Sequence, residues 1–223
     1  MDIFFIDYKN FSDTETEYII KNFGESYKLP KRQKEYAFGR FLAKTVCEKF
    51  YAKSDSEIAI KNKKPYFINN PELHFSISHS KNLVLTAFGQ NKTGADVEFM
   101  SERDFEKIFN YYNIKPEKFD KTTFYRFWTE YEAKIKLQTE PKSFLTLKIL
   151  PDYLLSVVSE ESFDIKAMLK IYELKSPTAS TNPSELISRK LVNASSENEN
   201  TVVIQEINTA SLEFFEPLNL KTE

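Results

Sequence analysis

The chain has 223 residues, 41% of them hydrophobic, and it carries 20 Phe, 12 Tyr and a formal net charge of −2. This length and these apolar side chains allow one large domain, although two small lobes that pack closely fit better. The nearly neutral charge argues against a general nucleic-acid-binding protein, so any basic surface has to be local.

The single cysteine, Cys47, excludes an internal disulfide and gives no sign of an oxidising compartment. It falls on a predicted helix without an adjacent His, which favours a buried structural thiol over a nucleophile. Residues 1–7 are too short and too acidic for a signal peptide, and no apolar run approaches the roughly 20 residues of a membrane-spanning helix. We therefore expect a cytoplasmic protein without membrane contact, and we expect it to act as a monomer.

The N-terminal part of the chain predicts a strand followed by two helices. Residues 2–7 read as a strand, and Ser12 with Glu15 forms a capping-box pattern that opens a helix, which Gly24 can end. A second helix is predicted over 31–51, where apolar residues recur at helical spacing.

Four cations, Lys28, Lys31, Arg32 and Lys34, gather at the start of this second helix. Cations there face the positive end of the helix dipole, which is unfavourable unless an anion is bound. The pattern therefore points to a phosphate, with Arg32 as the strongest candidate. A basic turn that is simply solvated explains any one of these side chains equally well.

The middle of the chain predicts a sheet that carries both histidines. Residues 73–79 alternate as a strand, a turn follows, and 83–89 and 94–99 form two more strands. His74 begins the first of these strands without an evident charged partner, which favours a structural or surface role. His79 is expected near the acidic third strand, although by pattern alone a structural role is favoured for it as well.

The second half of the chain predicts two further helices and two further strands. A helix is expected over 101–110 and a longer one over 121–138, followed by strands near 143–149 and 152–158. This alternation of helices and strands indicates an α+β fold.

The C-terminal tail differs in character from the rest of the chain. Residues 176–183 read as a linker and 193–200 as a polar loop, with a strand-like segment at 202–204. The tail is expected to add an edge strand or to lie against the second half of the molecule.

Two pairs of charged residues have spacings that place them on common faces. The segment 94–98 reads Gly-Ala-Asp-Val-Glu, and on a strand Asp96 and Glu98 point the same way. Glu132 and Lys136 share a face one turn apart on the long helix. Two strand acids and a helical carboxylate suit Mg²⁺, which takes oxygen ligands together with water and phosphate. A half-solvated strand and an ordinary ion pair between positions i and i+4 fit the same spacing, so both alternatives stay open.

Several segments of the chain resemble the signature of the Sfp-type 4′-phosphopantetheinyl transferases in their residues, in their order and in their separation. The acidic segment 94–98 is similar to the family's Gly-Ile-Asp-Ile-Glu, and 127–136 is similar to its Phe/Trp-Ser/Thr-x-Lys-Glu-Ala/Ser-x-x-Lys. Upstream, Lys-Pro at 64–65 and His-Phe-Ser-Ile-Ser-His-Ser at 74–80 resemble the family's Lys-Pro and Phe-Asn-Ile-Ser-His-Ser elements. The basic segment 31–40 is similar to the helix that ends in Gly-Arg in these enzymes.

The resemblance implies an enzyme that transfers the 4′-phosphopantetheine group from coenzyme A to a serine of an acyl or peptidyl carrier protein. It implies Mg²⁺ as cofactor, with Mn²⁺ as the alternative ion, and adenosine 3′,5′-bisphosphate as the product released. The carrier then belongs to lipid, polyketide or nonribosomal peptide biosynthesis. The implied fold is α+β, with two similar lobes in a pseudo-twofold arrangement, each a small antiparallel sheet packed with helices. The lobes span 1–93 and 94–174, and 175–223 forms a divergent extension.

The resemblance also implies roles for single residues. Asp96, Glu98 and Glu132 are the expected metal ligands, Glu132 is expected to accept the serine proton, and Lys136 is expected to stabilise the departing phosphate. Arg32 and His79 are expected to contact the 3′-phosphate of the coenzyme. The full set of expected coenzyme contacts is Lys28, Lys31, Arg32, Lys64, Ser78, His79 and Lys136.

The chain departs from the family pattern in three places, one of which is the stretch from Lys136 to the strand at 152–158, which is shorter than the family usually has. Tyr131 stands where the family usually has Lys, so Lys134 or Lys136 has to supply that cation. The resemblance fades after about Leu174. These departures keep two alternatives open. The first is a non-catalytic module of the same fold that binds coenzyme A or a carrier protein, and the second is a Mg²⁺-dependent phosphohydrolase.

Overall fold

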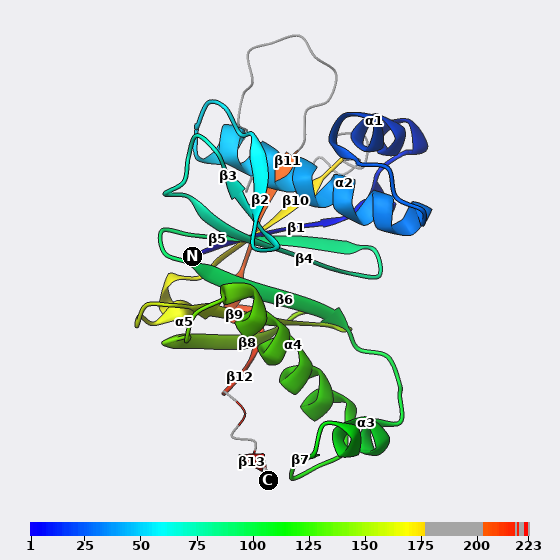
Figure 1. Cartoon of the computed structure of the whole chain (residues 1–223), viewed down its shortest axis with the longest axis vertical. Coiled ribbons are helices and arrows are strands. Elements are labelled where there is room, and N and C mark those ends of the chain that lie inside the picture. The colour runs from blue at the N-terminus through cyan, green and yellow to red at the C-terminus, as the bar shows by residue number, and fades with distance from the viewer. Residues whose placement is uncertain (177–202, 217, 219–220, 223) are drawn as a thin grey trace.

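The computed structural model describes residues 1–176, 203–216, 218 and 221–222, and it has an α+β fold. Two sheets lie between helices, and helix-covered faces point outward on both sides (Figure 1). The α+β class that the alternation of elements predicts is confirmed. Within the described residues, no helix combines the length and the apolar character needed to cross a lipid bilayer.

The first sheet has five strands in the order β11-β10-β1-β5-β4. They are β1 (Asp2–Asp7), β4 (His74–Ser80), β5 (Leu83–Gly89), β10 (Lys170–Lys175) and β11 (Val203–Ile207). β10 runs parallel to β1, and the other pairs are antiparallel. The expectation of two purely antiparallel sheets is therefore wrong for this one, because β10 returns from the second half of the chain to pair with β1.

The second sheet is antiparallel, with four strands in the order β12-β8-β9-β6. They are β6 (Thr93–Phe99), β8 (Ser143–Leu150), β9 (Tyr153–Ser159) and β12 (Glu213–Phe215). Two small ribbons complete the strands, β2 (Ile58–Lys61) with β3 (Lys64–Phe67) and β7 (Ile114–Lys115) with β13 (Lys221–Thr222).

Five α-helices flank the sheets in the described part of the chain. They are α1 (Asp13–Phe23), α2 (Pro30–Thr45), α3 (Phe105–Tyr111), α4 (Lys121–Leu137) and α5 (Ile165–Met168). α2 continues as a π-helical turn, Val46–Phe50, and the 3-10 turns Tyr8–Asn10 and Thr209–Ser211 follow β1 and β11.

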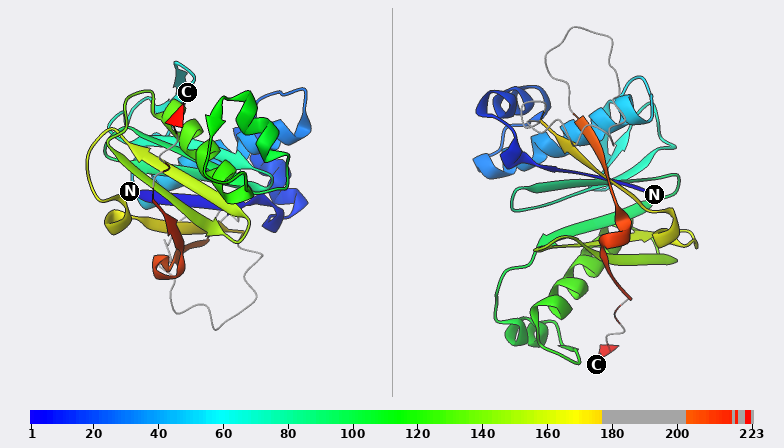
Figure 2. Two further views of the ribbon diagram at one scale, coloured as in Figure 1. Left: turned by 90° about the horizontal axis from the view of Figure 1, so that it is seen from below. Right: turned by 180° about the vertical axis from the view of Figure 1, so that it is seen from behind.

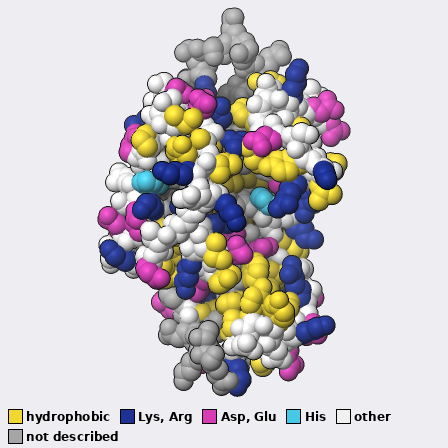
Figure 3. Space-filling model, viewed as in Figure 1, with side chains coloured by type: hydrophobic (Ala, Val, Ile, Leu, Met, Phe, Trp, Pro, Cys, Tyr) yellow, Lys and Arg dark blue, Asp and Glu magenta, His cyan; other side chains and the backbone are white. Residues whose placement is uncertain are grey.

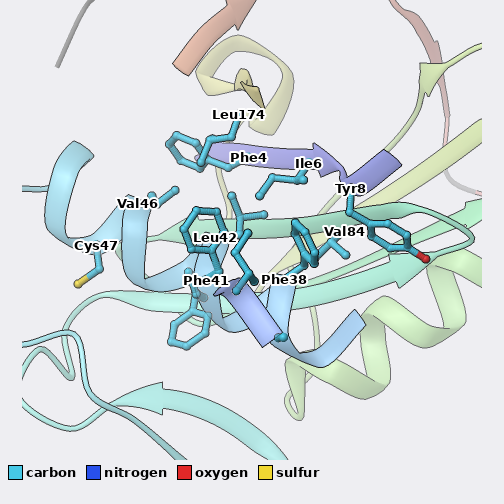
Figure 4. Packing of buried hydrophobic residues seen from close by; sticks show 14 of the residues in the cluster. Phe4, Ile6, Tyr8, Phe38, Phe41, Leu42, Val46, Cys47, Val84 and Leu174 are labelled. Atoms are coloured by element: carbon cyan, nitrogen blue, oxygen red, sulfur yellow. The ribbon is translucent and has the colours of Figure 1, made fainter. Parts of the chain in front are cut away.

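β1 buries both of its faces, because successive side chains of a strand enter different cores. Phe4 and Ile6 pack beneath α2 with Phe38 (Figure 4). Ile3 and Phe5 instead enter the core between the two sheets. This arrangement explains why the first strand is a continuous apolar run rather than an alternating one.

Most predicted elements are confirmed, and two boundaries are corrected. The capping box forms, since Ser12 and Glu15 exchange side-chain and backbone hydrogen bonds, and Gly24 ends the helix. The predicted helix over 31–51 loses its α-helical form after Thr45, and the one over 101–110 starts only at Phe105. Cys47 is buried and free, as expected.

The C-terminal tail contributes to both sheets. β11 is an edge strand of the first sheet and β12 is an edge strand of the second, so the described part of the tail runs from one sheet to the other (Figure 2). The predicted strand at 202–204 corresponds to β11. Apart from Ser176, the predicted linker 176–183 and the polar loop 193–200 lie outside the described residues.

α4 crosses the outer face of the second sheet and packs directly against β6. A methyl group added at Gly94 would overlap the carbonyl oxygen of Ala133 and would lie 2.8 Å from the backbone nitrogen of Leu137. Only glycine permits this close approach of strand and helix. Gly94 therefore sets how near α4 comes to the acids of β6.

We expect Gly94→Ala to lower the free energy of unfolding by about 1–3 kcal/mol, because α4 has to move outward as a whole. Urea denaturation measures the loss. Gly39→Ala is the matched control and should cost less, since the nearest atom there is a side-chain methyl, Cγ2 of Ile77 at 3.0 Å, rather than backbone. Equal stability of Gly94→Ala and the wild type would contradict the close packing of α4 on β6.

Candidate functional site

A row of serines on β4 joins the two sheets. β4 is the edge of the first sheet and β6 is the edge of the second. The backbone N–H groups of Ala95, Val97 and Phe99 donate to the Oγ atoms of Ser76, Ser78 and Ser80 at 3.1, 3.2 and 3.0 Å, respectively. The serine spacing of two matches the strand repeat, so each of these hydroxyls reaches β6.

The same serines hold the two acids of β6. Ser78 Oγ donates to Asp96 Oδ1 at 2.7 Å, and Ser80 Oγ donates to Glu98 Oε2 at 2.7 Å. Asp96 and Glu98 therefore both turn toward β4, as the strand spacing predicts. The second oxygen of Asp96, Oδ2, is buried and has no hydrogen-bond partner among the described residues. A buried carboxylate oxygen without a donor is costly, so it marks a place for a cation or a water molecule.

Lys136 on α4 supplies the cation of this cluster. Its Nζ lies 2.6 Å from Asp96 Oδ1 and donates to Ser78 Oγ at 2.9 Å. Glu132 lies one turn earlier on α4, is half-buried, and makes no ion pair within the described part of the chain. The alternative of an ordinary Glu132–Lys136 pair is therefore wrong, because the close packing of α4 on β6 brings Lys136 to Asp96 instead.

Two neighbours of Glu132 on α4 contact aromatic rings. Tyr131 stacks on Phe127 with ring centroids 5.9 Å apart, and Lys134 Nζ lies 4.9 Å from the ring centroid of Phe144. Of the two lysines expected to replace the cation missing at position 131, Lys136 is the one that reaches the acids.

We expect Tyr131→Lys to lower the free energy of unfolding by about 0.5–1.5 kcal/mol, the size of one lost aromatic pair. The ring is 44% exposed and packs on Phe127 and Trp128, so the added charge is tolerated but brings no new contact to Asp96. Tyr131→Phe keeps the stacking and serves as the control. A Tyr131→Lys protein that is as stable as Tyr131→Phe in urea denaturation would contradict this structural role.

A pocket of about 310 Å³ brings together two residues predicted to bind the nucleotide end of the coenzyme. Arg32 from α2 and His79 from β4 both line it, although 47 positions separate them in the chain (79 − 32). Arg40 and Lys63 add two further cations that sequence reasoning missed. Figure 3 shows Lys and Arg side chains gathered beside histidine on this face of the molecule.

Aromatic rings form another wall of this pocket. The rings of Tyr27 and Tyr36 lie 5.2 Å apart, and the guanidinium of Arg40 lies 4.5 Å from the ring centroid of Tyr36. Flat rings beside a guanidinium suit a planar base, and the cations suit a phosphate. The pocket therefore combines the two kinds of contact that a nucleotide requires.

Glu35 is a buried acid in this pocket that sequence reasoning missed. It lies 3.4 Å from Lys31 Nζ and 3.5 Å from His79 Nδ1. Burial lowers the pKa of His79 below its usual value, and Glu35 opposes this shift. The spacing of four between Lys31 and Glu35 on the predicted helix was the available signal. Glu35 lies on the Nδ1 side of His79, so Nε2 is the ring nitrogen that remains for a ligand.

The other predicted coenzyme contacts lie outside this pocket. Lys28 is exposed, and Lys31 is paired with Glu35. Lys64 Nζ donates to the carbonyl of Thr93 at 2.9 Å and lines a different pocket, because the ribbon of β2 and β3 turns it to the other side. Ser78 uses its hydroxyl within the cluster around Asp96.

A divalent cation fits the acids of β6 only in part as the side chains stand. Within the described residues, no group of three or more His, Cys, Asp and Glu side chains is close enough to hold a metal ion by itself. Mg²⁺, however, is commonly bound by one or two carboxylates and completed by water and phosphate. The unpartnered Oδ2 of Asp96 suits such an ion. Burial raises the pKa of Glu98, and its hydrogen bond from Ser80 opposes that shift.

The comparisons with known proteins add no relative from which a function could be transferred. No family model matches the chain, and no curated protein shows significant similarity to it. A functional conclusion therefore depends on the motif residues and on the geometry that brings them together.

Proposed function

We propose that the protein transfers the 4′-phosphopantetheine group from coenzyme A to a serine of an acyl or peptidyl carrier protein. One observation carries the proposal, which is that Asp96 and Lys136, 40 positions apart, meet at 2.6 Å beside Ser78. All three belong to segments that resemble the transferase signature. A chance match of short motifs gives no reason for their side chains to converge.

The pocket of Arg32 and His79 supports binding of the nucleotide end of coenzyme A. Its cations would pair with the 3′-phosphate, where charge-assisted hydrogen bonds are strong. Tyr27 and Tyr36 offer flat surfaces for the base. β4 links this pocket to the cluster of Asp96, Ser78 and Lys136, since it carries both His79 and Ser78.

We assign Mg²⁺ or Mn²⁺ to Asp96. Glu98 and Glu132 are the further ligands that the motif resemblance implies. The ion, when bound, would neutralise charge on the pyrophosphate of the coenzyme. Ser78 and Ser80 keep the strand acids oriented toward β4. The orphan Oδ2 of Asp96 supports this assignment because it gains a partner when a cation binds.

The remaining chemistry is assigned to two residues of α4. Glu132 accepts the proton of the carrier serine, whose oxygen forms a bond to the phosphorus that carries the pantetheine arm. The bond from that phosphorus to the departing adenosine 3′,5′-bisphosphate breaks in the same step, and Lys136 stabilises the charge on the leaving oxygen. No covalent intermediate on the protein is required.

The proposal also covers the arrangement of the two lobes and the cellular context of the protein. One long helix covers the outer face of each sheet, α2 on the first and α4 on the second, which supports two related lobes in a pseudo-twofold arrangement. We propose that the protein acts as a cytoplasmic monomer on carrier proteins of lipid, polyketide or nonribosomal peptide biosynthesis.

Intact-mass measurement on a panel of apo carrier proteins, with coenzyme A and Mg²⁺, tests the proposal. The expected result is the added mass of one phosphopantetheine group on at least one carrier, lost when the metal is chelated. Retained coenzyme A binding without modification of any carrier would support a non-catalytic binding module. Release of adenosine 3′,5′-bisphosphate in the absence of a carrier would support a phosphohydrolase.

A further inference from the structure

A second cationic pocket, of about 180 Å³, lies on the other side of the ribbon of β2 and β3. Its basic side chains are Lys61, Lys64, Lys92 and His74. The proposed function uses none of them except Lys64, which the structure turns away from the pocket of Arg32. This second pocket is called the hairpin pocket below.

Two lysines of the hairpin pocket stand directly opposite each other. Lys61 ends β2 and Lys64 begins β3, and the two are paired across the ribbon. The turn between them holds Asn62 and Lys63 at positive φ values of 52° and 64°, which fixes a tight two-residue hairpin. Like charges directly opposite on paired strands are destabilising, and an anion bound between the two lysines would offset this repulsion.

Lys64 is the half-buried cation of the hairpin pocket. Its Nζ donates to the carbonyl of Thr93, and the described residues offer no acceptor for its other two N–H groups. Burial lowers its pKa to about 8, Glu160 opposes this shift, and Lys92 adds to it. A half-buried amine whose other two N–H groups have no acceptor among the described residues can donate them to a bound ligand.

The described acids balance these charges only in part, since Glu160 is the acid whose charge acts on Lys64. Glu160 pairs with Lys92 at 3.2 Å and accepts from its backbone N–H, so it is committed to that residue. Neither Lys61 nor Lys64 has a carboxylate within 4.0 Å among the described residues. The floor of the pocket, in contrast, is apolar and is formed by Pro65, Tyr66, Leu73 and Phe75.

We propose that the hairpin pocket binds a small organic anion, a carboxylate or phosphate on a flat apolar body. The anionic group lies between Lys61 and Lys64, where it accepts from the free N–H groups of Lys64. The apolar body rests on the floor beside Tyr66. A volume of about 180 Å³ suits a small molecule better than a whole nucleotide. The site is independent of the proposed transfer reaction.

The test measures how fast each lysine amine is acetylated by trace N-hydroxysuccinimidyl acetate at pH 8, with the sites located by tandem mass spectrometry. The probes are benzoate, acetate and inorganic phosphate, each compared with chloride at equal ionic strength. We expect benzoate to slow acetylation of Lys64 at least threefold and at lower concentration than acetate, while the exposed Lys142 is unaffected. Protection by phosphate alone would assign the site to phosphates and would contradict the role of the apolar floor.

Two exposed positions on the same turn give matched variants. Lys61→Ser should raise the benzoate concentration for half-protection of Lys64 at least fivefold, whereas Lys63→Ser should leave it unchanged, because Lys63 lines the pocket of Arg32. Equal acetylation of Lys64 with benzoate and with chloride would overturn the proposal. Protection of Lys63 rather than Lys64 would also overturn it, since the anion would then occupy the other pocket. No coenzyme is present, so a failed transfer assay does not bear on this result.

Discussion

Asp96→Asn is expected to reduce carrier modification by about 100-fold or more, equivalent to at least about 2.7 kcal/mol of lost transition-state stabilisation. The amide is close in shape to the carboxylate and can still accept the hydrogen bond from Ser78. The contact between β4 and β6 should therefore be retained. What disappears is the negative charge that pairs with Lys136 and attracts a divalent cation. Initial rates at saturating coenzyme A and rising Mg²⁺ measure the effect.

The fold of this variant has to be checked separately, because Asp96 is buried. A melting temperature within a few degrees of the wild type keeps the rate loss interpretable. Glu132→Ala should be similarly inactive, and Glu98→Ala should lose less, since water can replace one Mg²⁺ ligand. Glu140→Ala, an exposed acid just beyond α4, is the matched control. Wild-type turnover of the Asp96→Asn variant would contradict the assignment of Asp96 as a metal ligand.

Arg32→Ala is expected to raise the KM for coenzyme A about 10- to 100-fold, while the KM for 3′-dephospho-coenzyme A stays nearly unchanged. The range converts the roughly 1.5–3 kcal/mol that a hydrogen bond to a charged group contributes. Arg32 is exposed, lines the pocket beside His79, and has no carboxylate partner among the described residues, so its guanidinium is available to a ligand. Steady-state kinetics with both donors give the comparison.

Lys28→Ala provides the control for this experiment. Lys28 belongs to the same basic cluster but does not line the pocket, so its loss should change both donors little and equally. If Arg32→Ala weakens both donors to the same degree, the side chain acts on another part of the coenzyme. His79→Ala is a poorer probe, because it also removes a partner of the buried Glu35.

Local patterns predicted the elements well where a short-range cause dominates. The helix expected over 121–138 forms over Lys121–Leu137, because its apolar residues recur at helical spacing and Asp120 caps its first turn. The strands expected at 83–89 and 152–158 form within one residue of their predicted bounds. These elements depend on neighbours a few positions away, which a sequence displays directly.

Elements held by distant partners were missed or placed only loosely. β10 pairs in parallel with β1, which lies about 170 positions earlier in the chain. No local sequence pattern predicts that pairing. The short ribbon of β2 and β3 is a local hairpin, and it too was missed, because its segment was read as a loop. Its formation turns Lys64 away from the pocket of Arg32 and His79, although the resemblance implies a coenzyme contact for Lys64.

The sequence by itself determined which chemical groups are present and which of them share a face. Asp96 with Glu98, and Lys31 with Glu35, follow from the repeats of strand and helix, because covalent geometry sets those spacings. Only the tertiary structure decided which groups meet. Lys136 reaches Asp96 because Gly94 lets α4 lie against β6.

The same distinction separates the two cationic pockets. The sequence shows a run of lysines at 61, 63 and 64 without saying which share a pocket. The tight turn of the β2–β3 ribbon directs Lys63 to the side of Arg32 and Lys64 to the side of Thr93. Burial and charge balance depend on such packing between distant segments, and they arise only when the chain has folded.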